Sequence, residues 1–366
     1  MSLVTFLGIY FVRKAGIDVA TVGVAFLCEH GLRGTLAPMF GALSDRIGRR
    51  ALLIVAALAT AVVLPCFLLV SGPASLIAWS IAMGIVGSVN IPVSNALLLD
   101  LAPVERRQSV LALNYTLMSV AYTLGVSPAG YVAERSYVVL AVISSIGYLM
   151  VGLLYAIALR GTLPLEKTAT GVLRNTVSAF RDRTFLLFAL MACVFPLSMG
   201  MVVTVSPLYG ADLGLGEGYI GLVLGGNSLI VAALALPAAT RMEALGPFSL
   251  LGAAAAMVSA ALFFYALVPD PAAALLIGTV VFSFGEIVFS SAVPAAVARL
   301  APAGRRGAYQ GGWALIASFS MGSALVLSGW LQVRIGWQGA WLAYAGLVAA
   351  AAVALFLVRD RFRTRA

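Results

Sequence analysis

The ten residues Gly41-Ala-Leu-Ser-Asp-Arg-Ile-Gly-Arg-Arg50 connect two long apolar runs and concentrate glycine and charge in one short stretch. Gly41 and Gly48 permit a close approach of two helices and a tight turn. Asp45 is an acid among cationic residues at a helix end, and the arginines around it are expected to hold the turn at a membrane surface. The stretch therefore predicts a charged connection between two membrane helices.

The composition of the whole chain indicates a membrane protein. Of its 366 residues, 62% are hydrophobic and 10% are charged, and the mean hydropathy is +1.04. Soluble domains carry about 25% charged residues, so most of this surface must face lipid. The apolar runs are continuous rather than alternating, which favours helices over a closed barrel. We therefore expect an all-α membrane protein.

Twelve apolar runs are candidates for membrane helices, each of which needs roughly 20 residues to cross. They lie near residues 1–12, 19–42, 51–71, 74–99, 109–132, 137–159, 184–209, 218–240, 248–268, 272–297, 308–331 and 337–358. The first run is too short to cross, and no basic segment precedes it. We expect a clipped start that removes part of helix 1, and we expect no signal peptide.

The runs group into two lobes of six helices. The expected domains are an N-terminal lobe at 1–159, a linker at 160–183, a C-terminal lobe at 184–358 and a basic tail at 359–366. Within the linker, Val172, Leu173, Val177 and Phe180 fall on one helical face, which predicts a helix in the membrane interface. A solvated linker without a helix is the alternative.

Two segments repeat at almost one spacing, which indicates that the lobes are duplicated. Leu101–Arg107 matches Leu300–Arg306 at an offset of 199 residues, and Asp45–Gly48 matches Glu243–Gly246 at an offset of 198. Parallel repeats of this kind are a transporter architecture with the substrate site between the halves, near the middle of the membrane.

Basic residues are distributed unevenly between two sets of loops. Eighteen of the 23 follow even-numbered runs, four follow odd-numbered runs, and Arg33 lies within a run. Because cytoplasmic loops are the more basic ones, these 18 residues and the C-terminus are expected in the cytoplasm. The membrane topology thus explains the net charge of +9 better than nucleic-acid binding would. We do not expect nucleic acid as a partner.

The stretch Gly41–Arg50 resembles the signature loop of the major facilitator superfamily. That loop has a glycine, three residues, an aspartate, three positions including a glycine, and two basic residues, between the second and third helices. The twelve runs, the repeat and the long central loop fit the same family, and the chain is most similar to its bacterial drug and metabolite exporters. The resemblance implies a two-lobed secondary transporter that works by alternating access.

The resemblance also implies roles for particular residues. In the family, the signature loop belongs to a cytoplasmic charge cluster that favours the outward-facing state and breaks as the lobes rock inward. The gating and signature residues carried over to this chain are Gly41, Asp45, Gly48, Arg49, Arg50 and, at the end of the fourth run, Asp100.

Charged residues inside membrane runs are functional hypotheses, because a charge at mid-bilayer costs about 2.5–3.5 kcal/mol on insertion scales. Glu286 lies near the middle of the tenth run, a helix that lines the central cavity in the resembled family. It could carry a proton, because a low-dielectric site disfavours the ionised form, or bind a cationic substrate. The alternative is a structural acid hydrogen-bonded to the eleventh run, for example near Gln310.

A second group of ionisable residues lies in the second run. Glu29 and Arg33 are four residues apart and share one helical face, so they are expected to pair. Either the pair is structural or gating, or it takes part directly in transport. His30 is the only histidine and points about 100° away from Glu29, so a proton-linked role is open to it but a metal site is not expected.

Several polar and aromatic residues in the runs are candidates for lining the cavity, with helix packing as the alternative. These are Tyr10, Asn90, Asn95, Asn114, Phe195, Met199, Asn227, Phe289 and Gln310.

The sequence shows no sign of enzymatic chemistry. Cys28, Cys66 and Cys193 lie in apolar runs without the spacing of metal ligands. A glycine-rich phosphate loop and a nucleophile–base–acid triad are both missing from the sequence. We therefore expect no metal, no cofactor and no direct use of ATP.

The sequence predicts a monomeric, multi-pass transporter in the cytoplasmic (inner) membrane of a bacterium. Its expected function is proton-coupled efflux of a drug-like compound or metabolite. One alternative is a facilitator or importer of a sugar or organic anion, with Arg33 binding the anionic group. Another is a membrane sensor with the transporter fold but no transport.

Overall fold

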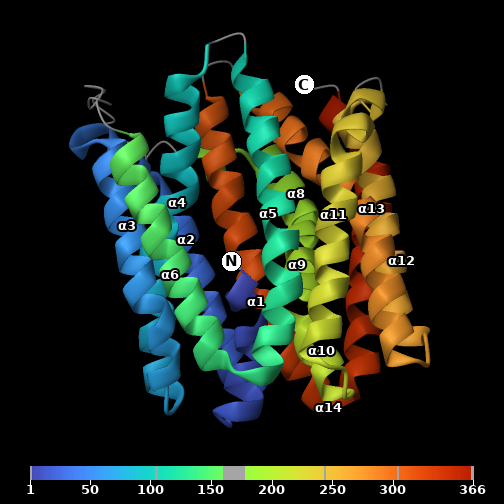
Figure 1. Cartoon of the computed structure of the whole chain (residues 1–366). Coiled ribbons are helices and arrows are strands. Elements are labelled where there is room, and N and C mark those ends of the chain that lie inside the picture. Colours follow the sequence, from blue (N-terminus) through green and yellow to red (C-terminus); the bar gives the residue numbers. More distant parts are fainter. Residues whose placement is uncertain (1, 104–105, 160–177, 243–244, 303–304, 364–366) are drawn as a thin grey trace.

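The computed structural model describes residues 2–103, 106–159, 178–242, 245–302 and 305–363, and within these ranges it contains helices and no strands (Figure 1). In the first half of the chain the helical segments are α1 (Ser2–Ile9), η1 (Tyr10–Lys14), α2 (Val19–Ile47), α3 (Arg49–Val63), η2 (Leu64–Leu69), α4 (Pro73–Leu101), α5 (Arg107–Arg135) and α6 (Tyr137–Ala158). In the second half they are η4 (Ala179–Arg181), α8 (Arg183–Ala192), α9 (Val194–Gly200), η5 (Met201–Val205), α10 (Ser206–Asp212), α11 (Glu217–Met242), α12 (Pro247–Leu267), α13 (Pro271–Leu300) and α14 (Arg306–Arg363).

In the described part of the chain these segments form twelve helical stretches at the positions of the twelve predicted runs. Eight stretches are long and apolar enough to cross a bilayer, and one of them runs through α14, where Gly336 leaves the helical conformation and separates two spans. The segment α8–α10 forms a single span from Arg183 to Asp212. Three further helical stretches are α1 together with η1, then α2, and then α5. The expected interfacial helix lies outside the described residues except for Phe180.

The two halves repeat each other in backbone geometry. Gly16 and Gly48 have positive φ angles of 67° and 93°, and so do Gly214 and Gly246, at 87° and 70°, each 198 residues later. This left-handed region is one that glycine occupies without strain. α4 and α13 both begin at a proline, again 198 residues apart, because proline is well accommodated in the first helical turn.

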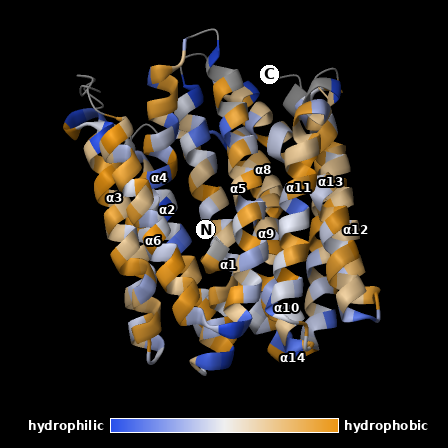
Figure 2. Cartoon of the chain, viewed as in Figure 1, coloured by the Kyte–Doolittle hydropathy of each residue, from blue (hydrophilic) through white to orange (hydrophobic). Residues whose placement is uncertain are grey.

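The bundle has two ends, which we name by their loops. The basic end carries the connection around Gly48 and the C-terminus, and the opposite end carries the connections from Lys14 to Asp18 and from Asp212 to Glu217 (Figure 1). Hydrophobic residues cover the middle of the bundle, and hydrophilic residues gather at the ends (Figure 2). Large apolar side chains such as Leu124 (71% exposed) lie on the outer surface, which is the pattern of a lipid-facing bundle.

The halves meet along two pairs of helices, α2 with α14 and α5 with α11. A glycine at each of these contacts lets the two helix backbones approach closely. A Cβ atom at Gly23 would lie 2.5 Å from the backbone nitrogen of Val326, and one at Gly221 would lie 2.8 Å from the carbonyl oxygen of Val126. Small residues at such crossings let helix backbones approach in a membrane.

Candidate functional site

A central cavity of about 310 Å³ lies between the two halves. Its wall is mostly apolar, with Val4, Met83, Met118, Met199, Leu224 and Met321 among its lining residues. Polar groups enter at separate points: His30, Arg33 and Asn90 from the first half, and Asn227, Ser228 and Glu286 from the second. An apolar wall with a few placed polar groups is the usual make-up of a small-molecule site.

Glu286 is the acid of this cavity. It lies near the middle of α13 and is 5% exposed. The amide of Asn227, on α11, donates to its Oε2 at 3.0 Å and to the Ser283 hydroxyl at 2.9 Å. Among the ion pairs of the described residues, none includes Glu286. The carboxyl therefore depends on a neutral amide partner and faces the cavity without a cation beside it.

If Glu286 has only a structural role, the sequence predicts Gln310 as its neighbour. The structure places the Gln310 side chain elsewhere. The Gln310 side chain donates to the Pro294 carbonyl oxygen at 2.8 Å. This bond joins the start of α14 to the second half of α13, two helical turns beyond Glu286. The polar partner of Glu286 comes instead from α11.

Arg33 and Glu29 form the second charged group. Their side chains meet at 2.6 Å on α2, with Glu29 1% exposed and Arg33 28% exposed. Arg33 lines the cavity, while Glu29 is not among the described residues that do. Two glycines of α4 make room for them. A Cβ atom at Gly87 would lie 2.6–2.9 Å from the guanidinium of Arg33, and one at Gly84 would lie 2.8 Å from the carbonyl oxygen of Glu29.

His30 lines the cavity next to this pair, and its Nδ1 lies 3.0 Å from the carbonyl oxygen of Phe26. The contact is one helical turn back on α2, so half of the ring's hydrogen-bonding capacity is used locally.

The structure places six of the predicted lining residues away from the cavity, and three of these are aromatic. Tyr10 packs against Phe67 and Tyr137, at ring-centroid distances of 4.9 and 5.0 Å. Phe195 and Phe289 stack on each other at 5.0 Å. Each of these rings contacts other aromatic rings of its own half, at the centroid distances that aromatic pairs prefer.

The remaining three are polar and serve other contacts. Gln310 bonds to Pro294, as described above. Asn114 donates to Asn95 at 3.3 Å and so joins α5 to α4. Hydrogen bonding between helices is the common use of asparagine in membranes. The other predicted lining residues, Asn90, Met199 and Asn227, do line the cavity.

Three tyrosines that sequence reasoning missed also line the cavity: Tyr115, Tyr122 and Tyr148. Tyr122 lies 2.9 Å from the Thr5 hydroxyl and so joins α5 to α1. Tyr115 and Tyr122 are seven residues apart, which is two helical turns and one face of α5. That spacing is a signal that could have found them.

The signature-loop residues form a compact charge cluster at the basic end. Arg49 lies 3.0 Å from Asp45 and 2.5 Å from Asp100, and all three side chains are 14–23% exposed. Arg50 donates to the Ala156 carbonyl at 2.7 Å. The ion pairs therefore join α2, the start of α3 and α4 within the first half. A Cβ atom at Gly41 would meet nothing within 4 Å, so the close helix approach expected at this glycine is not found, whereas Gly48 supplies the left-handed turn.

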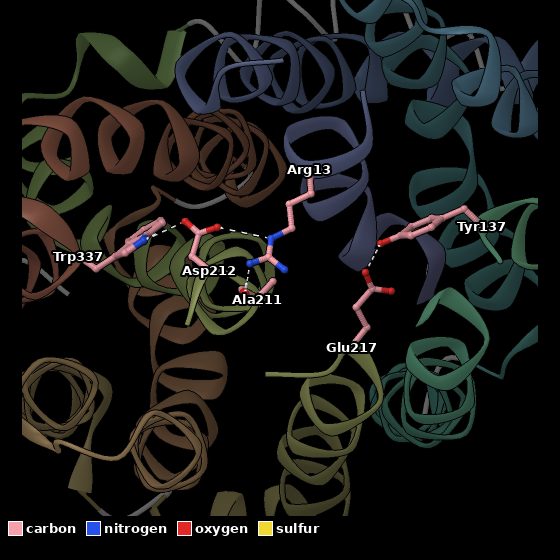
Figure 3. A network of polar contacts seen from close by, with 6 residues as sticks. All are labelled: Arg13, Tyr137, Ala211, Asp212, Glu217 and Trp337. Atoms are coloured by element: carbon pink, nitrogen blue, oxygen red, sulfur yellow. Dashed lines mark hydrogen bonds and ion pairs between the residues drawn. The ribbon is translucent and has the colours of Figure 1, made fainter. Parts of the chain in front are cut away.

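At the opposite end, polar contacts join the two halves (Figure 3). Arg13 lies 3.7 Å from Asp212, and Tyr137 donates to Glu217 at 2.9 Å. Deeper in the bundle, Thr123 donates to the Gly225 carbonyl at 3.1 Å. These contacts and two further hydrogen bonds between the halves lie at this end or near the middle of the bundle, and on the basic-end side of the middle Tyr115 of α5 also hydrogen-bonds to Ser290 of α13. The structure is thus a state held closed at the opposite end.

Asp45, Arg49 and Asp100 all belong to the first half, so the ion pairs of this cluster lie within one half. The gating role expected for the cluster, which would break as the lobes rock inward, stays a prediction.

Comparisons with known proteins agree with this architecture. The family model for the Major Facilitator Superfamily matches residues 1–268 and 188–366. The Na(+), Li(+), K(+)/H(+) antiporter of Planococcus maritimus is 28% identical over 349 residues, covering 83% of this chain and 79% of that protein. The uncharacterized MFS-type transporter YqjV of Bacillus subtilis (strain 168) is 23% identical over 318 residues, covering 84% and 77%.

Solved structures share the fold at low sequence identity. A point mutant of the nucleoside transporter NupG has a TM-score of 0.81 at 14% identity, covering 97% of this chain and 95% of that one. A D-xylose-proton symporter has a TM-score of 0.70 at 16% identity, covering 97% and 92%. The chain therefore belongs to the major facilitator superfamily, and it is a membrane transporter rather than an enzyme.

Proposed function

We propose that this transporter is a proton-coupled antiporter that exports a small molecule through the central cavity, with Glu286 as the group that carries the proton. The observation that carries the proposal is the position of Glu286, a carboxyl in the middle of a membrane helix that faces the cavity and bonds to a neutral amide. An acid in such a site is a functional hypothesis by default.

The orientation of the proposed exchange follows from the loops. The basic end faces the cytoplasm, because lysine and arginine are retained on that side during insertion. The cavity, closed at the opposite end, would then receive its substrate from the cytoplasm. Proton entry from the outside would follow when the cavity opens at the other end, which corresponds to efflux across the inner membrane of a bacterium.

The cavity supports a small, partly apolar cargo. A volume of about 310 Å³ is near the lower limit of typical ligand pockets, about 300–1,000 Å³. Its methionine-rich wall adapts to different shapes because the thioether chain is flexible and polarizable. One acid among such residues suits a lipophilic cation, which would compensate the Glu286 carboxylate when the proton has left.

An alkali cation is the second candidate cargo. It is favoured by the relative from Planococcus maritimus, which is named as an antiporter of Na⁺, Li⁺ and K⁺ against H⁺. The Glu286 carboxylate and the Asn227 amide are oxygen-bearing groups, the type of ligand that such hard cations prefer. The anion-binding alternative is less favoured, because the Arg33 guanidinium is already paired with Glu29 at 2.6 Å.

Everted membrane vesicles distinguish the two cargoes. With a pH gradient (acid inside) reported by a fluorescent weak base, we would add ethidium, NaCl, LiCl or KCl. A transported cation releases protons from the vesicles and restores the fluorescence. We expect this response with wild-type protein and its loss in Glu286→Gln. A response of the Glu286→Gln variant equal to wild type would contradict the proposal.

The matched control is Asp270→Asn, an acid-to-amide change on the same stretch of chain. Asp270 caps the N-terminus of α13 by accepting from the Ala273 backbone amide at 2.7 Å, and asparagine caps equally well. Asp270→Asn should respond as wild type does. The comparison separates the loss of an acid in the cavity from the loss of an acid on this helix.

A further inference from the structure

A second cavity lies at the basic end of the second half, outside the central cavity. Its volume is about 640 Å³, and its lining shares no described residue with that of the central cavity. The lining comes from two stretches that are far apart in the chain, 178–184 at the start of α8 and 302–309 between α13 and α14. We call this cavity the basic pocket. Its volume is within the range of pockets that hold small ligands.

Three arginines line the basic pocket, namely Arg181, Arg183 and Arg305, and all three are exposed. Among the ion pairs of the described residues, none includes any of these arginines. Asp182 is the acid of the described lining, so three positive charges and one negative charge give this wall a formal charge of +2. The pocket therefore gathers guanidinium groups that an anion can reach from the solvent.

The carboxylate of Asp182 is used by its own neighbours and not by the arginines. Its Oδ1 accepts from the backbone amides of Thr184 at 2.9 Å and Phe185 at 3.4 Å, and so caps the start of α8. Its Oδ2 accepts from the Tyr309 hydroxyl at 2.9 Å, which joins the start of α8 to the first turn of α14. These bonds hold the wall of the pocket together without using a guanidinium.

Arg305 bridges the two stretches that form the pocket. Its Nη2 donates to the Ser178 hydroxyl, and its guanidinium carbon lies 5.8 Å from the centre of the Tyr309 ring. A guanidinium has five N–H donors in a planar fork, and one bond to a hydroxyl uses one of them. Arg305 is therefore held in position while most of its donors remain for a ligand.

The chemistry of this wall suits a phosphate group. Guanidinium groups bind phosphate oxygens through pairs of charge-assisted hydrogen bonds, and a wall of charge +2 matches a phosphate dianion or two singly charged phosphates. A nucleotide is less favoured, because a base needs an aromatic face on which to stack. Tyr309 is the aromatic residue of the described lining, and its ring already packs against Phe185 at a centroid distance of 5.0 Å.

We propose that the basic pocket binds a phosphate-bearing anion at the membrane surface. Two sources share this chemistry, the headgroup of an anionic phospholipid and a soluble phosphate. Basic pockets between helices on the cytoplasmic side of membrane proteins take lipid headgroups. A bound anion joins the stretch before α8 to the connection between α13 and α14, and it stabilises the folded protein by mass action. The site involves neither Glu286 nor the central cavity.

Thermal unfolding of the full chain in an uncharged detergent tests the site and distinguishes the two sources. The lipid arm compares added cardiolipin with phosphatidylcholine, and the soluble arm compares sodium phosphate with sodium chloride at equal ionic strength. We expect the apparent melting temperature to rise by about 2 °C or more above the reference in at least one arm. A rise with cardiolipin alone identifies a headgroup site, a rise with phosphate alone identifies a soluble anion, and a rise in both supports a site for the shared group.

Two double variants locate the binding. Arg181→Gln/Arg183→Gln removes two positive charges from the pocket, and the matched control Arg46→Gln/Arg241→Gln removes two exposed arginines of the basic end that do not line it. In a titration with the anion that responds, the pocket variant should raise the apparent Kd by about tenfold or more, and the control should stay within about twofold of wild type.

Each shift is measured against the melting temperature of the same variant without the anion, so a change in basal stability does not affect the comparison. The absence of a rise in both arms with the wild-type protein would overturn the proposal. An equal loss of affinity in the two double variants would also overturn it, because that result indicates a general attraction of anions to the basic end.

Discussion

At the scale of single residues, the chain uses charge in three distinct ways. Arg49 holds two carboxylates together at the basic end, Arg33 holds one carboxylate inside α2, and Glu286 has no cation among its described partners. A paired charge stabilises a helix arrangement, whereas an unpaired acid in a cavity is available for exchange. This contrast is why we assign proton transfer to Glu286 and not to Glu29.

Removal of Arg49 should harm the protein more than removal of either acid. Arg49→Ala leaves Asp45 and Asp100 facing each other without a cation, so we expect a loss of about 1–3 kcal/mol in stability. Asp45→Asn should lose less. The variant Asp45→Asn/Arg49→Ala/Asp100→Asn should recover part of the loss, because no like charges remain. Thermal unfolding in detergent measures the order of stability among these variants. A triple variant that is less stable than Arg49→Ala would contradict the electrostatic explanation.

Two glycines three residues apart on α4 should respond differently to alanine. A Cβ atom at Gly84 meets backbone of α2, which cannot move alone, so Gly84→Ala should lower stability. A Cβ atom at Gly87 meets the guanidinium of Arg33, which can swing aside. Gly87→Ala should therefore lower stability less than Gly84→Ala does, and it should lower transport, because Gly87 and Arg33 both line the cavity. Comparison of melting temperature with transport rate checks both, and equal melting temperatures for the two variants would contradict the distinction.

At the scale of helices, the sequence predicted where the helices lie along the chain better than which side chains of different helices contact each other. The spacing of apolar runs predicted every membrane helix within a few residues, because hydropathy over a span is a local property. The partner of Glu286 was not predictable in this way. Asn227 and Glu286 are 59 residues apart and meet only through the packing of α11 on α13. For the same reason Phe195 and Phe289 could not be identified as a stacked pair.

Close helix contacts should make particular glycines irreplaceable. A Cβ atom at Gly130 would overlap the backbone carbonyl of Glu217, where α5 meets the start of α11. Gly130→Ala should thus lower the apparent melting temperature by roughly 2–6 °C, since overpacking costs about 1–3 kcal/mol.

Gly147→Ala on α6 is the control for Gly130→Ala. It has nothing within 4 Å of the added methyl group and should be neutral or stabilising. If both glycines tolerate alanine equally, the α5–α11 contact is looser than the structure shows.

At the scale of the whole molecule, the two ends of the bundle differ in which helices their polar contacts join. The opposite end carries contacts between the halves, and the charge cluster at the basic end joins helices of one half. The repeat predicted from Leu101–Arg107 and Leu300–Arg306 extends to the left-handed glycines and helix starts. The sequence alone could not predict which end is closed, because that depends on contacts between halves rather than on any segment.

The central claim is that Glu286 carries the proton that drives transport, and proteoliposomes test it most directly. Two quantities would be measured with ethidium or with the alkali cation that responds in vesicles: accumulation driven by a pH gradient, and exchange at equal pH. For Glu286→Gln we predict a loss of gradient-driven accumulation of about tenfold or more, with exchange within about twofold of wild type. Gradient-driven accumulation at the wild-type level in Glu286→Gln would contradict the claim and make Glu286 a structural residue.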